Sequence, residues 1–145
     1  MGRFYTFRAQ AAFTTAITIL ELTAAAGKPL RLIRAWVSQV TSETSQQLGV
    51  QILRKTATIT GSALAAVKHN QNDGAPGVTG KHTASGEGTD GDVLLGEGFN
   101  ALNGWLYLPV PEERIYVLPA GILALKLIEA PTGGTFEVGM TVEEE

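Results

Sequence analysis

Cysteine is absent from this chain of 145 residues, and long apolar runs are absent as well. Without cysteine there are no disulfides, thiolate metal sites or cysteine nucleophiles, so stability must come from packing or from partner chains. No segment approaches the roughly 20 apolar residues of a membrane span, and the start MGRFYTFRAQ has no apolar run long enough for a signal peptide. We therefore expect no membrane partner, and a protein made and used or assembled in the cytoplasm of its producing cell.

Basic charge is also scarce. Eleven lysines and arginines stand against fourteen aspartates and glutamates, which gives a formal net charge of −3 and a sequence pI of about 5.4. Nonspecific binding to nucleic acid requires a basic face, which this composition disfavours. The alternative is a local basic patch that forms only when the chain folds. We expect no nucleic-acid partner. The content of 44% hydrophobic and 17% charged residues is that of one globular domain with a sizeable core.

Aromatic side chains disappear between Gly61 and Gly98, and eight of the seventeen glycines fall between Gly74 and Gly98. The section HNQNDGAPGVTGKHTASGEGTDGD has the composition of turns and irregular chain. A loop of this length in a compact domain is usually functional or disordered. We predict a single domain over residues 1–145 with a Gly-rich inserted arm or loop at 61–98. Shortening it from Asn70 to Gly88 is expected to leave the fold intact.

Alternation of apolar and polar residues predicts β-strands elsewhere in the chain. In QQLGVQILR the residues Leu48, Val50 and Ile52 share one face. In the last segment the predicted inward face consists of Phe136, Val138, Met140 and Val142. Further strand candidates are RFYTFRAQ, DVLLGEGFN, GWLYLP and RIYVLP.

Three segments depart from simple alternation. In TTAITILELT the apolar face switches between Ile19 and Leu20, which indicates a β-bulge or burial on both faces. Both faces of segment 30–40 are largely apolar, as in a central strand covered twice. Its predicted faces are Leu30, Leu32, Trp36 and Val40 on one side, and Ile33, Ala35 and Val37 on the other. AGILALKLIEA alternates similarly, and a helix is the alternative because of its propensities.

Together these segments predict eight or nine strands and an all-β fold, a jelly-roll-like β-sandwich with a long irregular insertion. Turn signals such as AAAGKP, LNG and APTGG separate the strands, and SALAAVKH is a candidate for a short helix. Strands distant in sequence must pair in such folds, so the strand order does not follow from the sequence.

Candidate reactive groups are few. His69 and His82, the only histidines, both fall in the Gly-rich insertion. Zinc needs three or four ligands, so exposed loop histidines are favoured over a metal pair. Ser62 or Ser85 beside a histidine would be a nucleophile pair, but no nucleophile-elbow pattern is present. We predict no catalytic residue, no metal site and no cofactor.

Two acidic pairs also have ordinary structural interpretations. Asp90 and Asp92, in TDGD, suggest a calcium loop, but the 12-residue ligand pattern is absent and a turn is favoured. Glu112 and Glu113 suggest an acid/base pair. Because adjacent residues on a strand point to opposite faces, a solvated turn is favoured there too.

The aromatic residues leave two alternatives open. On a strand, Tyr5 and Phe7 would face one way and Phe4 the other. The N-terminal segment is therefore either a core strand, which we favour, or an arm that packs on a neighbouring subunit. Trp36 and the aromatic residues of GWLYLP would suit a carbohydrate platform, but their strand positions favour a buried core.

The overall layout of the chain resembles a family of small phage proteins. The segments that carry the resemblance are AITILELTAAAGKPLRLIRAW, QLGVQILR, GWLYLPVPEER, LKLIEAP and FEVGMTVEEE. They are similar to segments of the capsid decoration, or cement, proteins of long-tailed Thermus phages and of related uncharacterised phage proteins. The resemblance covers nearly the whole chain outside the insertion and includes no diagnostic catalytic motif.

The resemblance implies a jelly-roll-like trimer on the outer surface of the icosahedral virion of a thermophilic phage, where it would stabilise the shell. Its partners would be the major capsid protein, its own chain as a homotrimer and neighbouring decoration trimers, with no enzyme activity and no cofactor. A receptor- or glycan-binding module of a phage tail or fibre is the alternative. The residues expected to contact capsid or subunits are Arg3, Phe4, Tyr5, Phe7, His69, Asn70, Asn72 and His82.

Overall fold

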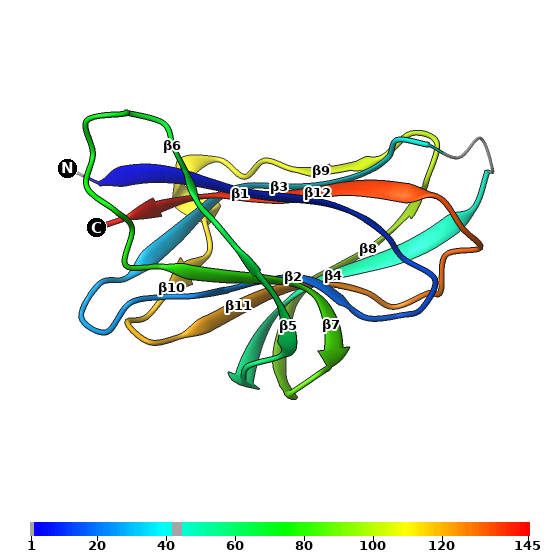
Figure 1. Ribbon diagram of the computed structural model, residues 1–145, viewed down its shortest axis with the longest axis horizontal. Coiled ribbons are helices and arrows are strands. Elements are labelled where there is room, and N and C mark those ends of the chain that lie inside the picture. Colours follow the sequence, from blue (N-terminus) through cyan, green and yellow to red (C-terminus); the bar gives the residue numbers. More distant parts are fainter. Residues whose placement is uncertain (1, 42–44) are drawn as a thin grey trace.

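The computed structural model describes residues 2–41 and 45–145 and shows a sandwich of two antiparallel sheets (Figure 1). Within these residues there is no α-helix, and Pro111–Glu113 forms a short 3₁₀ turn. The predicted all-β sandwich is confirmed, and its jelly-roll form stays a prediction.

Over residues 2–41 and 45–145 each sheet has six strands, so the described chain has twelve strands where eight or nine were predicted. The first sheet has the order β10-β3-β12-β1-β6, and β9 pairs with β3 along the same edge as β10. The second sheet has the order β5-β7-β2-β11-β4-β8. The strands of the first sheet are β1 (Arg3–Ala12), β3 (Leu30–Gln39), β6 (Val67–Lys68), β9 (Trp105–Tyr107), β10 (Tyr116–Val117) and β12 (Thr135–Glu144). Those of the second are β2 (Thr18–Thr23), β4 (Gln47–Ala57), β5 (Thr60–Leu64), β7 (Thr79–Gly86), β8 (Thr89–Asn100) and β11 (Ile122–Leu127).

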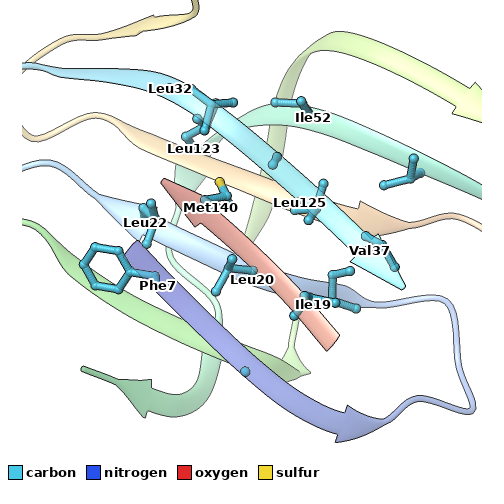
Figure 2. Close-up of a cluster of buried hydrophobic side chains, with 14 of the residues drawn as sticks. Phe7, Ile19, Leu20, Leu22, Leu32, Val37, Ile52, Leu123, Leu125 and Met140 are labelled. Atoms are coloured by element: carbon cyan, nitrogen blue, oxygen red, sulfur yellow. The ribbon is translucent and has the colours of Figure 1, made fainter. Parts of the chain in front are cut away.

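The hydrophobic core lies between the two sheets and takes one face of each long strand. Figure 2 shows Phe7 of β1 and Met140 of β12 close to Leu20 of β2 in the opposite sheet. Burial of such side chains contributes about 25 cal/mol per Å² of apolar surface. The alternation predicted for residues 48–52 and 136–142 is confirmed, since every apolar residue of those two faces is buried.

The N-terminal segment is a core strand. β1 pairs with β12 along its whole length and with β6 at residues 5 and 6, and Tyr5 and Phe7 are buried. The alternative of an N-terminal arm on a neighbouring subunit is therefore wrong for Arg3–Ala12. The helical alternative for AGILALKLIEA is wrong too, because β11 runs through it, and SALAAVKH contributes to β5 and β6.

A β-bulge in β2 explains the switch of its apolar face. Leu20 pairs with Leu125 and Thr18 pairs with Lys126, which leaves Ile19 as the extra residue. The extra residue lets Ile19 and Leu20, although adjacent, both join the core. The predicted bulge is confirmed.

A second bulge, in β3, overturns a prediction. The β3–β12 register shifts between Thr141 and Val142, which makes Ile33 an extra residue. The core side of β3 consequently consists of Leu30, Leu32, Ala35 and Val37. Trp36 lies on the outer face, where its ring covers Gly139. The predicted faces of segment 30–40 were wrong because strict alternation assumes that no residue is inserted.

The aromatic-free segment 61–98 is built into both sheets, mainly the second. It supplies most of β5 and β8, together with β6 and β7, and β7 pairs with β2. Its longest stretch without a strand is 69–78. The prediction of an irregular inserted arm or loop is therefore corrected: glycines and small polar residues here form strands, because neighbouring strands satisfy their backbone groups.

Candidate functional site

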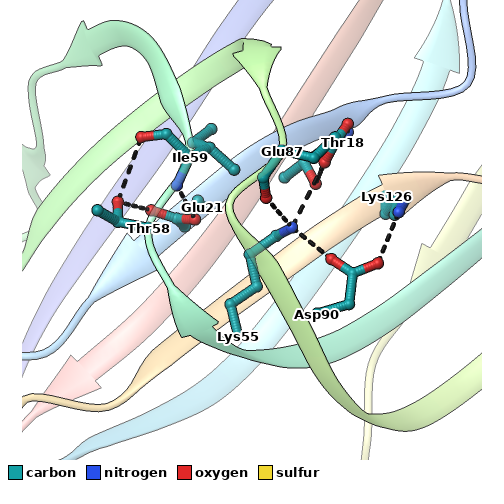
Figure 3. Close-up of polar contacts among 8 residues, drawn as sticks. All are labelled: Thr18, Glu21, Lys55, Thr58, Ile59, Glu87, Asp90 and Lys126. Carbon is teal, nitrogen blue, oxygen red and sulfur yellow. Dashed lines mark hydrogen bonds and ion pairs between the residues drawn. The ribbon is translucent and has the colours of Figure 1, made fainter.

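A buried lysine is the first candidate for reaction chemistry. The side chain of Lys55, on β4, is fully buried. Its ammonium donates to Asp90 Oδ1 at 2.6 Å and to the Glu87 backbone carbonyl at 2.7 Å, and Glu87 Oε2 lies 3.4 Å away (Figure 3). Lys126 reaches the other oxygen of Asp90 at 2.6 Å, and Thr18 donates its N–H and hydroxyl to the two oxygens of Glu87. The cluster therefore joins β2, β4, β8 and β11.

The surroundings of Asp90 and Glu87 favour the charged form of both carboxylates. Burial acts to raise the pKa of Asp90, but hydrogen bonds and charges from Lys126 and Lys55 outweigh it and hold that pKa below the ordinary value. Burial likewise acts to raise the pKa of Glu87, but hydrogen bonds from Thr18 and the charges of the two lysines outweigh it and lower that pKa. A general base or acid works best with a pKa near the operating pH. The cluster is therefore a structural clasp.

Two other carboxylates, those of Glu21 and Glu144, are buried and accept hydrogen bonds from the main chain. Glu21 accepts a hydrogen bond from the Ile59 N–H at 3.0 Å and from the Thr58 hydroxyl at 2.5 Å (Figure 3). Glu144 accepts from the N–H groups of residues 77 and 78, each at 2.9 Å. We call Glu21, Glu87 and Glu144 the carboxylate clamps. In each of them one oxygen accepts from main-chain N–H and the other accepts from a side chain.

The two histidines lie in different segments, and only His82 belongs to a strand. His69 follows β6 and is exposed, and its Nε2 is 2.7 Å from the hydroxyl of Thr6. His82 lies in β7, where it pairs with Leu20 of β2, so the prediction that it is an exposed loop residue was wrong. The part of the chain that the structure describes contains no group of three or more residues suited to hold a metal ion. It also contains no helix long and apolar enough to cross a membrane.

The two acidic pairs have different outcomes. Asp90 and Asp92 lie in β8, which begins at Thr89, so the predicted turn was wrong. Glu112 and Glu113 lie in the exposed 3₁₀ segment, so the predicted solvated turn is confirmed.

The rings predicted to be core residues are divided between core and surface. Trp105 is buried and stacks on Tyr107, with ring centres 6.3 Å apart. Burial and the charge of Glu113 raise the pKa of Tyr107. Trp36 lies on the outer face of the first sheet, where the guanidinium of Arg34 sits 4.4 Å from its ring centre. The buried-core prediction holds for Trp105 and fails for Trp36.

An apolar surface, not a reactive cluster, is the most distinctive feature of the exterior. Of the twelve exposed large hydrophobic residues in the described chain, eight lie between residues 93 and 118. We call these eight the β8–β10 surface: Val93, Leu94, Leu102, Leu106, Leu108, Val110, Tyr116 and Leu118. Exposed apolar residues scattered singly are normal, whereas a concentration of them marks a binding surface.

The topology places these residues at or near the edges of the two sheets. β8 is the outermost strand of the second sheet, and β9 and β10 form an edge of the first. The chain passes directly from β8 to β9, so both edges lie on one side of the sandwich (Figure 1). The Trp105 indole donates to Glu97 of β8 at 2.9 Å, and Arg54 donates to the Tyr116 carbonyl at 3.1 Å. Edge strands also present unpaired backbone groups to a partner.

The eight residues predicted as contacts fall into three groups. Tyr5 and Phe7 are buried, so the structure excludes them as surface contacts. His82 lies on β7, away from the others. The remaining five are near one another, on β1 or in the turn after β6: Arg3, Phe4, His69, Asn70 and Asn72.

The sequence did not predict the β8–β10 surface. Its strands were recognised, and Leu106, Leu108 and Val110 do follow a period of two. That pattern predicts a buried face as readily as an exposed one, because the sequence does not say which strands end a sheet.

Comparison of the chain with protein-family models, with curated proteins and with solved structures finds no match.

Proposed function

We propose that the protein is a phage capsid decoration protein that binds the outside of an icosahedral head as a homotrimer and stabilises the shell. The observation that carries the proposal is the concentration of exposed apolar residues on the β8–β10 surface. A surface of this kind supports a role in binding protein. The resemblance of the sequence to decoration proteins supplies the capsid as the partner.

Attachment of this kind needs no chemical step. Each copy that buries apolar residues against its neighbours gains about 25 cal/mol per Å², less the cost of ordering the interface. A trimer on a symmetric shell makes several such contacts at once, so weak contacts add through avidity. Because the protein stabilises the state that it binds, decoration favours the assembled shell over separate subunits.

Co-sedimentation with undecorated phage heads tests the proposal. The wild-type chain is expected to pellet with heads, and a double variant, Leu106→Asp with Leu118→Asp, is expected to remain in the supernatant. Val40→Asp is the matched control, because Val40 is also exposed but follows β3, outside the β8–β10 surface. A wild-type protein that fails to pellet with heads in every maturation state would refute capsid attachment.

The homotrimer has a separate test. Size exclusion coupled to light scattering is expected to give three times the chain mass of 15.3 kDa at tens of micromolar. A monomeric mass at that concentration would contradict the trimer.

The alternative function, a receptor- or glycan-binding module of a phage tail or fibre, gains little support from its best candidate ring. Trp36 covers Gly139 and carries the guanidinium of Arg34 against its face, so little of the ring is free to stack on a sugar. Binding on a glycan array that is lost in Trp36→Ala would favour this alternative.

A further inference from the structure

We propose that a hollow on the outer face of the first sheet binds the carboxylate of an acidic side chain of a partner protein. The hollow has a volume of about 340 Å³ and is lined by Thr6, Ile33, Arg34, His69, Leu108 and Thr141. None of these residues is acidic. We call this site the Arg34 hollow.

The fold brings these six residues together from five parts of the chain. Thr6 on β1 pairs with Thr141 on β12, and Thr141 pairs with Arg34 on β3, so the three form one row across the sheet. The β3 bulge lies beside this row, and bulges commonly re-aim side chains at binding sites. His69 and Leu108, from the segments after β6 and β9, complete the lining on the same face.

Arg34 is held in place but is not neutralised. Its guanidinium lies 4.4 Å from the ring centre of Trp36, a cation–π contact that orients it. Within the described residues it has no ion pair, whereas Arg8 is paired with Glu137 and Arg31 with Glu145. A guanidinium presents donors in a planar fork that fits a carboxylate with two parallel hydrogen bonds.

A chain of hydroxyl groups adds a second donor to the site. His69 Nε2 lies 2.7 Å from Thr6 Oγ1, which lies 2.9 Å from Thr141 Oγ1. If His69 donates to Thr6, then Thr6 donates to Thr141, and the Thr141 hydroxyl hydrogen is free for a bound anion. The direction of such a chain is set by the groups at its ends, and an anion in the hollow selects this one.

The walls favour a carboxylate on an apolar stem. Ile33 and Leu108 line the hollow beside the polar row, so the methylene groups of a glutamate side chain would contact carbon while its carboxylate meets Arg34. A phosphate also fits one guanidinium, but it has no apolar stem to contact Ile33 and Leu108. The nearest acidic residue along β12 on this face, Glu143, packs against Gly2 instead.

The partner is inferred to be a protein because the hollow adjoins the β8–β10 surface. Leu108 belongs to both, so a protein that covers the apolar surface extends naturally over the hollow. The anion site itself stands on its own geometry and does not rest on capsid attachment. Its test measures binding of small molecules, so its failure is distinguishable from a failure to pellet with heads.

The experiment is an NMR titration of the isotope-labelled full chain at constant ionic strength. The probes are butyrate, which mimics a glutamate side chain, its neutral analogue butyramide, and inorganic phosphate. We expect butyrate to shift the Arg34 Nε–Hε and Leu108 methyl signals saturably, with a dissociation constant in the millimolar range. Butyramide is expected to give no saturable shift, and phosphate is expected to bind more weakly than butyrate.

Substitutions locate the site. Arg34→Gln is expected to weaken butyrate binding about tenfold, which corresponds to about 1.4 kcal/mol. Thr141→Val, which removes the hydroxyl donor at similar volume, is expected to weaken it less. Arg8→Gln is the matched control, because Arg8 is paired on the same face outside the hollow, and it should leave binding unchanged. Equal binding of butyrate and butyramide, tighter binding of phosphate, or unchanged binding in Arg34→Gln would each overturn the assignment.

Discussion

The side of the sandwich that holds β5 and β7 differs from the β8–β10 side in how its polar and apolar groups are satisfied. On the side of β5 and β7, the carboxylate clamps Glu21, Glu87 and Glu144 bind main-chain N–H groups of the same protein. On the other side, the β8–β10 surface presents eight large apolar side chains to the exterior. The first side satisfies its polar groups internally, and the second leaves its apolar groups exposed.

This difference follows from composition. The segment 61–98 has no aromatic residue and little apolar volume in its first part, so hydrophobic burial alone cannot hold it against the sandwich. Carboxylates that are buried or partly buried, with hydrogen-bond donors on both oxygens, supply the missing attachment. The segment from Val93 to Leu118 is apolar enough to pack, but it lies at the edges of both sheets, where no further strand of the described residues covers it.

The largest effect is expected from removing a strand on the clamped side. Deleting residues 70–88 takes away β7 and the Glu87 clamp. We expect no cooperatively folded protein, as measured by near-ultraviolet circular dichroism and thermal melting. Replacing residues 70–73 with four residues of glycine and serine is the control, and it should fold because no strand is lost. A folded deletion variant would show that the segment is an insertion after all.

Loss of one clamp should destabilise the protein without unfolding it. Glu144→Ala leaves the N–H groups of residues 77 and 78 without their acceptor. Each buried donor left unsatisfied costs on the order of 1–3 kcal/mol, so we expect the free energy of unfolding in urea to fall by about 3 kcal/mol. Glu144→Gln keeps one acceptor oxygen and should lose less. Equal stability of Glu144→Ala and wild type would remove the clamps from the explanation of the fold.

Acid should weaken the contacts that Glu87 and Asp90 make. The pKa values of Glu87 and Asp90 lie below their ordinary values of 4.5 and 3.8. The unfolded chain therefore takes up protons first as the pH falls, so the stabilisation is complete above the ordinary values and is lost below the folded-state values. The urea midpoint is expected to drop between about pH 5 and pH 3. In Glu87→Gln with Asp90→Asn, this drop should be smaller.

The smallest effect on stability is expected on the open side. Leu106→Asp with Leu118→Asp alters two side chains that are more than half exposed, so the free energy of unfolding should change by no more than about 1 kcal/mol. Association should change strongly, with a monomeric mass in light scattering. A folded double variant with the same mass as the wild-type protein would show that the β8–β10 surface is not an interface between copies.

Prediction from the sequence succeeded where one strand contains the whole signal. The inward faces of residues 48–52 and 136–142, and the bulge at Ile19, follow from the order of apolar residues within a strand. Prediction failed where pairing with a neighbouring strand determines the local structure. The bulge at Ile33 is visible only against the β12 register, and β7 forms because β2 and β5 lie on either side of it.

The candidate site residues show the same difference between what the sequence predicts and what strand pairing determines. His69 and Phe4 were named as contact candidates, and they lie at 6.2 Å between ring centres. Tyr5 and Phe7 were named with them although both are buried. Three partners of His69 in the Arg34 hollow, namely Thr6, Arg34 and Thr141, were missed, because nothing in their own segments indicates that they share a row across three strands.

By itself, the sequence determined the all-β class, the exclusion of cysteine chemistry, and the inward face of each regularly alternating strand, since these depend on residue type and local spacing. The tertiary structure alone decided which strands are edges, how the glycine-rich segment is held, and where Arg34 meets two threonines and a histidine. Those features depend on pairings between residues far apart in the chain, and local physical chemistry places no constraint on such pairings until the sheets form.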